Sequence, residues 1–248
     1  MQSQSQRRIF EQQVLRPVLD SYKKAAQELC GFMALRGSRY DNKLMVVGRA
    51  VNRWGCGKSI SDLKSLDARE KFIDGFFYPD GQCQMEWVAR NAGNTGGYNT
   101  NKSAFWRVIR QASRRLGVWQ DGNEEDWSSR LVWSNLYKIS PHDAGGNPSN
   151  GLCKIQEPGC IELLREEIRE YAPEKILFLT GWNWAWPFVT PLSSERQETS
   201  GLVEASGKID VLGHNKEIPF VVAKHPQGKP ESEWVEEVIS RFESVSAK

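Results

Sequence analysis

The sequence predicts an α/β fold, a three-layer α/β/α arrangement around a central, mainly parallel sheet of four strands. Two observations support this fold class and its organisation as one domain. Short apolar runs typical of buried strands alternate along the chain with amphipathic stretches at helical spacing. The 248 residues also contain no internal repeat and no low-complexity linker. We therefore expect one domain over residues 1–248, with a helical N-terminal segment over residues 1–40 packed on it.

The first part of the chain predicts a helix followed by a strand. Apolar residues at helical spacing predict a helix over residues 9–30, with a kink at Pro17. Residues 43–48 predict a short buried strand that Gly48 ends. Residues 55–101 are rich in Gly, Asn and Asp and predict only weak helices.

Clearer elements follow from Ser103 onward. Ser103 can cap a helix that runs to Leu116, and residues 130–135 predict a second strand. The next helix is expected to open at Pro158 or Gly159. A third strand is then predicted over residues 175–181.

The C-terminal part predicts the last strand and the last helix. Residues 201–215 indicate a hairpin or an irregular excursion, and residues 218–225 a fourth strand. The final helix begins near Glu231. It is expected to bury one apolar face, made of Trp234, Val235, Val238, Ile239 and Phe242.

Composition excludes several classes of protein. Lys and Arg number 33 against 31 Asp and Glu, so the net charge of +2 identifies no partner. The 5 cysteines show no paired spacing, which predicts reduced thiols rather than a disulfide framework or a zinc site. No stretch approaches the length of a membrane span. We expect a soluble, cytoplasmic monomer with no membrane partner.

Polar, aromatic and glycine residues follow the predicted strands where each strand ends. These endings are residues 48–54, 135–138, 181–184 and 225–228. Ligands of an open parallel sheet bind beyond the carboxyl ends of its strands. Each ending alone is consistent with a turn or a cap on the core, but together they predict a site at one edge of the sheet.

Two of these endings carry short motifs. Residues 48–51 read Gly-Arg-Ala-Val after the first strand, and residues 225–227 read His-Pro-Gln after the last. In this order the chain resembles the uracil-DNA glycosylase superfamily, whose motifs are G-x-[DNA]-P after strand one and H-P-[ST] after the last strand. The resemblance covers residues 43–242. It implies a monofunctional DNA glycosylase that flips a base out of DNA and hydrolyses its N-glycosidic bond to leave an abasic site.

The resemblance implies catalytic roles at both motifs. His225 would donate a hydrogen bond to the base carbonyl oxygen as charge develops on the leaving base. Val51 replaces the usual proline, and Gln227 replaces the usual Ser or Thr. Ala50 stands where many members keep an Asp or Asn to orient the attacking water. Candidates for that role are Asn52, Asp74, Asp80 and Asp143, of which Asn52 and Asp143 join His225 as the predicted catalytic residues.

Substrate contacts are predicted at the same edge. The amide of Asn135 can read the Watson–Crick edge of an extruded base. Backbone amides of residues 48–52 can bind phosphate or base oxygens. Tyr98, Trp54 or Phe105 can supply a stacking wall. The predicted substrate-binding residues are Gly48, Arg49, Ala50, Val51, Trp54, Tyr98 and Asn135.

DNA contacts are predicted on two further segments. Residues 227–230 are the expected wedge, with Gln227 and Lys229 on DNA. Arg110 and Arg114 extend a row that begins at Arg107 and suits a phosphate backbone, although such a row is also typical of a solvated helix face. The predicted partner is double- or single-stranded DNA containing a modified base.

The substrate is predicted from the Gly- and Asn-rich residues 91–100. Uracil is the family default, but this segment can line a roomier pocket. The hypothesis is a bulky modified pyrimidine, such as a glucosylated cytosine of phage DNA, with a role in antiphage defence; a role in base-excision repair is the alternative. The segment is equally consistent with a flexible loop. Hydrolysis by water requires no cofactor and no metal, and a Schiff-base route through Lys138 or Lys224 is the alternative.

Two other functions stay open. Gly57-Lys58-Ser59 resembles the end of a phosphate-binding loop, although Asn52 stands where that pattern needs a glycine. The other alternative is a non-catalytic nucleic-acid-binding or sensing module on the same fold, which Ala50 favours.

Overall fold

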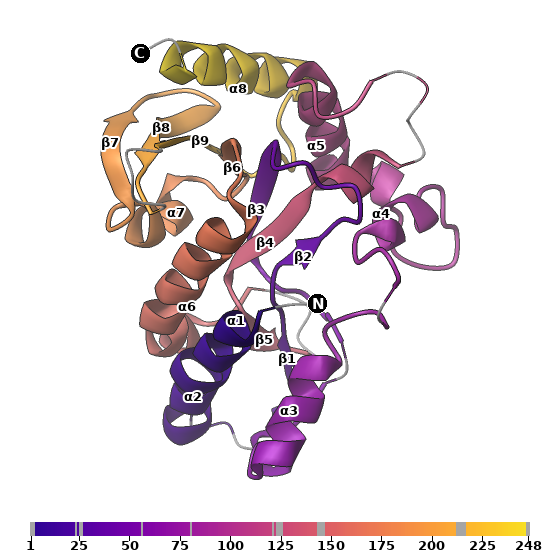
Figure 1. The fold of residues 1–248 in the computed structure, drawn as a ribbon, viewed down its shortest axis with the longest axis vertical. Coiled ribbons are helices and arrows are strands. Elements are labelled where there is room, and N and C mark those ends of the chain that lie inside the picture. The colour runs from indigo at the N-terminus through magenta and orange to yellow at the C-terminus, as the bar shows by residue number, and fades with distance from the viewer. Residues whose placement is uncertain are drawn as a thin grey trace. The chain divides into compact units, whose positions relative to one another are not determined.

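Two compact units make up the computed structural model of the protein (Figure 1), which describes residues 3–22, 24, 27–55, 57–79, 81–120, 122, 126–142, 147–211 and 217–246. Unit 1 comprises Met1–Ala34, Gly48–Asp80 and Asn135–Glu170. Unit 2 comprises Leu35–Val47, Gly81–Ser134 and Tyr171–Lys248. A single domain over residues 1–248 stays a prediction.

The main sheet has seven strands in the order β2-β4-β3-β6-β9-β8-β7. They are β2 (Leu35–Arg36), β3 (Leu44–Ala50), β4 (Val132–Tyr137), β6 (Lys175–Phe178), β7 (Ser193–Glu198), β8 (Val203–Ile209) and β9 (Ile218–Ala223). β6 is parallel to both β3 and β9, whereas β2, β7 and β8 pair antiparallel with their neighbours. The α/β class is confirmed, but the sheet is mixed, so the prediction of four mainly parallel strands was wrong.

The four predicted strands are the adjacent strands β4, β3, β6 and β9, and the ones that were missed have weak sequence signals. β2 has only two residues, and β7 is an exposed strand of polar and charged residues. β8 contains Gly207, where a Cβ atom would lie 1.9 Å from the backbone oxygen of Glu195. Because Gly207 has no side chain, β7 and β8 can approach closely. A glycine also interrupts the run of apolar residues by which a buried strand is recognised in a sequence.

Two helices of unit 2 agree with the prediction, whereas the helix over Trp182–Val189 was not predicted. α5 (Ala104–Arg115) and α8 (Glu231–Ser246) are confirmed, including the buried face of α8. α8 packs on α5 and on β8 and β9, and α7 (Trp182–Val189) also packs on β8 and β9 (Figure 1). The shorter elements α4 (Glu86–Arg90), η3 (Thr100–Lys102) and η4 (Trp127–Arg130) complete this unit.

Unit 1 differs from the prediction at both of its long helices. The N-terminal helix is formed by α1 (Gln4–Ile9), the π-helical η1 (Phe10–Leu15) and α2 (Arg16–Ser21). It therefore ends before residue 30, because the chain turns into β1 (Leu29–Gly31), which pairs with β5 (Ile139–Pro141). The shorter elements are η2 (Ile60–Leu63) and α3 (Leu66–Asp74).

α6 (Asn150–Tyr171) begins well before the predicted Pro158. Ser149 supplies the cap, since its hydroxyl accepts the N–H of Leu152 at 3.3 Å. Pro158 lies inside the helix, and Gly159 contacts η1. A Cβ atom on Gly159 would lie 2.0 Å from the backbone oxygen of Gln13, so only glycine permits this approach.

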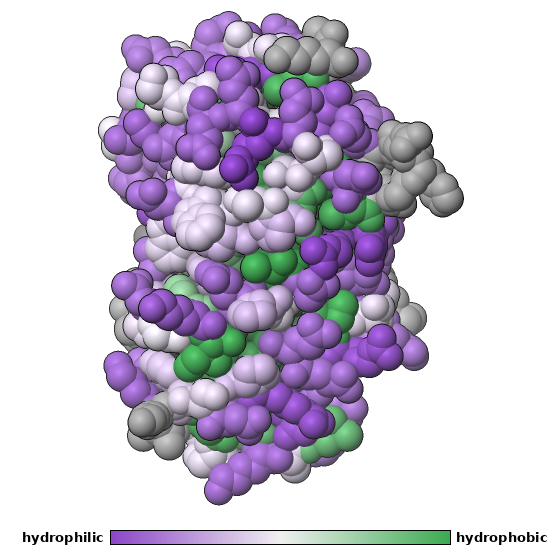
Figure 2. Space-filling view, turned by 90° about the vertical axis from the view of Figure 1, so that its left-hand side faces the viewer, coloured by the Kyte–Doolittle hydropathy of each residue, from purple (hydrophilic) through white to green (hydrophobic). Residues whose placement is uncertain are grey.

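No helix in the described ranges is both long and apolar enough to cross a membrane. Figure 2 shows one face of the molecule, on which hydrophobic residues reach the surface in small groups among hydrophilic ones. Scattered groups of this kind are ordinary for a protein surface and indicate no particular partner.

Candidate functional site

Three parallel strands of the sheet lie in register at their carboxyl ends. Val47 of β3 pairs with Phe178 of β6, which in turn pairs with Val222 of β9. Beyond the strands, the N–H of Gly181 donates to the oxygen of Ala223 at 2.9 Å. The segments that follow β6 and β9 therefore leave the sheet side by side, as predicted.

His225 follows β9 and is half-buried. Trp234 Nε1 donates to the oxygen of Lys224 at 2.8 Å, which fixes the backbone before His225. The Gln227 N–H donates to Nδ1 of His225 at 3.3 Å, and the His225 ring stacks on Phe105 with centroids 6.3 Å apart. Because Nδ1 accepts, a neutral imidazole carries its hydrogen on Nε2, and that edge of the ring is a hydrogen-bond donor.

The segment after β3 contains both packed and exposed side chains. Trp54 Nε1 donates to the oxygen of Phe76 at 2.9 Å, and its ring packs edge-on against Phe32. Val51 is buried, whereas Asn52 and Arg53 are exposed. Trp54 and Val51 therefore have a packing role in unit 1, and Asn52 faces solvent.

Two groups of predicted contact residues lie within strands instead of beyond them. β3 continues to Ala50, so Gly48, Arg49 and Ala50 are strand residues. Asn135 lies inside β4 and is buried. Gly48 was expected to end its strand, but a glycine keeps the N–H and C=O groups that a sheet requires.

The candidates for orienting a water molecule differ in their surroundings. Asp80 and Asp143 lie outside the described residues. Asp74 forms an ion pair with Arg7 within unit 1. Asn52 therefore stays the described candidate whose side chain is exposed and is not engaged by a charged neighbour.

The remaining predicted residues belong to unit 2. The Lys229 N–H donates to the oxygen of Pro226 at 3.0 Å and closes a turn on which Gln227 and Lys229 are exposed. Tyr98 is 56% exposed. Residues 48–54 and Asn135 belong to unit 1, and the meeting of the two motif loops in one site stays a prediction.

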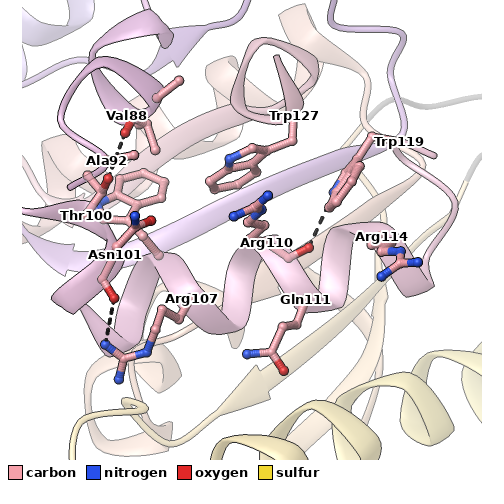
Figure 3. A pocket seen from close by; sticks show the side chains of 12 residues that line it. Val88, Ala92, Thr100, Asn101, Arg107, Arg110, Gln111, Arg114, Trp119 and Trp127 are labelled. Carbon is pink, nitrogen blue, oxygen red and sulfur yellow. Dashed lines mark hydrogen bonds between the residues drawn. The ribbon is translucent and has the colours of Figure 1, made fainter. Parts of the chain in front are cut away.

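A cavity of about 810 Å³ lies beside α5 within unit 2 (Figure 3). Its apolar walls include Val88, Ala92, Trp106, Trp119 and Trp127. The three indoles come from α5, the segment after it and η4, and each residue is buried. This volume is within the range of small-molecule sites, whose walls are also mostly apolar with a few polar groups.

The polar lining of the cavity includes the predicted arginine row. Arg107 is neutralised by Glu231, since its Nε donates to that carboxylate at 3.0 Å, and this hydrogen bond raises the pKa of Arg107. The guanidinium carbons of Arg110 and Arg114 lie 5.8 and 5.9 Å from the ring of Trp119. The row therefore faces a cavity with aromatic walls.

The Gly- and Asn-rich residues 91–100 contribute to this cavity. Ala92 and Thr100 line it. The amide of Asn99 instead donates to the oxygen of Asn94 at 3.0 Å, within the segment. Two residues of the segment therefore line the α5 cavity, and the roomier pocket for a modified base stays a prediction.

The residues of the phosphate-loop alternative have other roles in the structure. Lys58 exchanges backbone hydrogen bonds with Leu29, at 2.8 and 3.0 Å. Ser59 and Asp62 form a capping box on η2. A backbone bridge and a helix cap account for this stretch without a phosphate.

The two lysines of the Schiff-base alternative both lie near carboxylates. Lys138 is fully buried and its Nζ lies 2.7 Å from a carboxylate oxygen of Glu167. Lys224 lies 4.0 Å from Glu204. Lys138 is enclosed and cannot reach a substrate, as a Schiff base requires. Lys224 is partly exposed, and the route through it stays an alternative.

Sequence reasoning missed the three tryptophans as cavity walls. Trp106, Trp119 and Trp127 come from separate segments and share no spacing. The available signal was the abundance of tryptophan, 10 in the chain, alongside a helix with three arginines on one face.

A scan against protein-family models and a search of curated proteins find no match for this chain. Within the described ranges, no group of three or more His, Cys, Asp and Glu side chains is arranged to hold a metal ion. The geometry of His225 and of the α5 cavity is therefore the basis for inferring a function.

Proposed function

We propose that the chain is a DNA glycosylase that flips a modified pyrimidine out of DNA and hydrolyses its N-glycosidic bond, leaving an abasic site. The base would be uracil or a bulky cytosine derivative such as glucosylated hydroxymethylcytosine. The enzyme would act as a cytoplasmic monomer, in antiphage defence or base-excision repair.

The geometry of His225 carries the proposal. Its Nδ1 accepts the Gln227 N–H, and its ring stacks on Phe105, so the donating Nε2 edge is held in one orientation. Breaking an N-glycosidic bond places negative charge on the departing base. A fixed donor aimed at a base oxygen stabilises that charge more in the transition state than in the ground state.

The surface near α5 supports a nucleic-acid substrate. Phe105, which contacts His225, is followed in α5 by Trp106 and Arg110 of the cavity wall. Aromatic side chains beside arginines are typical of sites that hold unpaired nucleotides. Gln227 and Lys229, exposed on the turn after His225, would contact the strand from which the base is flipped.

Asn52 is our candidate for orienting the attacking water, together with Asp143. Asn52 is exposed directly after β3, and its amide oxygen can accept a hydrogen bond from water. An Asn52→Ala variant should lose activity while still binding DNA, which separates this role from a contact to the phosphate backbone.

The test is an abasic-site assay on duplexes and single strands that contain uracil, hydroxymethylcytosine or glucosylated hydroxymethylcytosine. Alkali cleaves the strand wherever a base has been removed. We expect product with the wild type on at least one substrate. His225→Ala should lower the rate roughly 10²- to 10³-fold, the usual effect of losing one transition-state donor. His225→Gln, which keeps a donor, should retain more activity.

Two results would contradict the proposal. Product that is unaffected by His225→Ala would remove His225 from the reaction. The absence of product on every substrate, with DNA binding intact and unchanged thermal unfolding, would favour the non-catalytic binding module. Exclusive activity on uracil would support the glycosylase and exclude the bulky base.

A further inference from the structure

Arg110 lines the α5 cavity together with Arg107 and Arg114, and it differs from Arg107 and Arg115 in its ion pairs. Arg107 is bound by Glu231 and Arg115 by Glu236, the latter at 2.5 Å. Among the described residues, no carboxylate lies within ion-pair distance of Arg110. Its guanidinium points toward the indole of Trp127 (Figure 3), and its central carbon lies 5.8 Å from the ring of Trp119. An arginine without a carboxylate partner keeps its hydrogen-bond donors for an anion.

The aromatic walls around Arg110 are held in place before any ligand arrives. The Trp119 Nε1 donates to the hydroxyl of Ser113 at 3.0 Å. Trp106 packs against Trp127 and Trp133, with ring centroids 6.3 and 5.3 Å apart. Because the walls are already ordered, a planar ligand that contacts them loses little affinity to their rearrangement.

We propose that the α5 cavity binds a nucleoside phosphate, with the phosphate on Arg110 and the base against the tryptophan walls. A planar guanidinium suits phosphate because it can donate two parallel hydrogen bonds. The indoles match an aromatic heterocycle, and the Asn101 and Gln111 amides in the lining can donate to and accept from its edge. The proposal goes beyond base excision and requires no reaction at His225.

The ligand can be a free nucleotide or one nucleotide unit of a single strand, since both present a base and a phosphate. Thymidine 5′-monophosphate, thymidine, inorganic phosphate and an oligothymidylate are the probes, titrated calorimetrically into the full chain. We expect thymidine monophosphate to bind at least tenfold more tightly than thymidine or phosphate alone. Tighter binding of the oligothymidylate identifies a strand as the source, and equal or weaker binding identifies the free nucleotide.

The decisive variant is Arg110→Gln. It should bring the affinity for thymidine monophosphate down to that for thymidine. Arg115→Gln is the matched control, because Arg115 lies on the same helix but pairs with Glu236 outside the cavity. It should leave the affinity unchanged. Arg110→Lys keeps the charge without the planar fork and should lie between the two.

The proposal is overturned if no phosphorylated probe binds, or if thymidine binds as tightly as its monophosphate. It is also overturned if Arg110→Gln, or Arg110→Lys should the first variant not fold, binds like the wild type. Nucleotide binding without any product in the abasic-site assay would leave this proposal standing and contradict only the glycosylase.

Discussion

A lysine in unit 1 and an arginine in unit 2 have opposite surroundings. In unit 1, Lys138 and Glu167 are both fully buried, and the amine lies 2.7 and 2.9 Å from the two carboxylate oxygens. Glu167 also accepts the N–H of Ala34 at 3.2 Å. In unit 2, the Arg110 guanidinium faces an 810 Å³ cavity.

The difference shows how environment decides the role of a cation. A buried pair whose hydrogen bonds are satisfied has no access to a ligand, so it fixes structure. A half-exposed guanidinium beside aromatic walls keeps both its charge and its donors for a ligand. From sequence alone, Lys138 was an alternative nucleophile, and Arg110 was a predicted phosphate contact that was also consistent with a solvated helix face.

The largest expected effect is in unit 1. Glu167→Ala should destabilise the protein by about 3–5 kcal/mol, because it leaves the Lys138 charge buried without a partner. The measurement is urea unfolding, followed by circular dichroism. A double variant, Lys138→Met with Glu167→Leu, should recover most of the loss. A cost below about 1 kcal/mol for Glu167→Ala would mean that the buried pair stabilises the fold no more than an exposed ion pair does.

Arg110→Gln should show the reverse pattern, with a large effect on binding and a small one on stability. We expect its free energy of unfolding to stay within about 0.5 kcal/mol of wild type, as for a surface substitution. In nucleic-acid binding, the magnitude of the slope of log K against log salt should fall by about 1, which corresponds to the loss of one phosphate contact. An unchanged salt slope would argue against a phosphate at Arg110.

Glu231→Gln tests whether Arg107 can also bind the ligand of the α5 cavity. It removes the carboxylate that neutralises Arg107, so a second cation becomes available at the cavity. The affinity for thymidine monophosphate should rise several-fold, while the loss of a favourable acidic residue in the first turn of α8 should cost about 0.3–1 kcal/mol of stability. If Arg107 does not reach the ligand, calorimetry will show no gain in affinity.

The smallest effect at neutral pH concerns a buried thiol of unit 1. Burial raises the pKa of Cys160 from 9.0 to about 12. Its stabilising contribution is therefore complete below pH 9.0 and is lost as the pH rises towards 12, because the unfolded thiol ionises first. Cys160→Ala should make the alkaline fall in unfolding free energy shallower, by about 1 kcal/mol at pH 10. Cys83→Ala, at a partly exposed thiol, is the control, and an equal change in both variants would refute the assignment.

The central strands and the C-terminal helix were predictable because burial leaves a direct mark on their sequence. The apolar runs of β3 and β9 and the helical spacing from Trp234 to Phe242 need no knowledge of neighbours. β7 was not predictable, since its exposed, charged residues form a strand only because β8 provides backbone partners. The start of α6 was missed because Pro158 was taken as the first residue of the helix, whereas the helix is capped at Ser149.

The candidate site was predictable in its residue types and much less in their surroundings. The position of His225 after a buried strand and the placement of Arg107, Arg110 and Arg114 on one face of a helix follow from the sequence alone. The ion pair between Glu231 and Arg107 and the tryptophan-walled cavity beside Arg110 appear only in the folded chain. The physical reason is that burial and helical periodicity are properties of one segment, whereas a cavity and an ion pair depend on segments far apart in the chain.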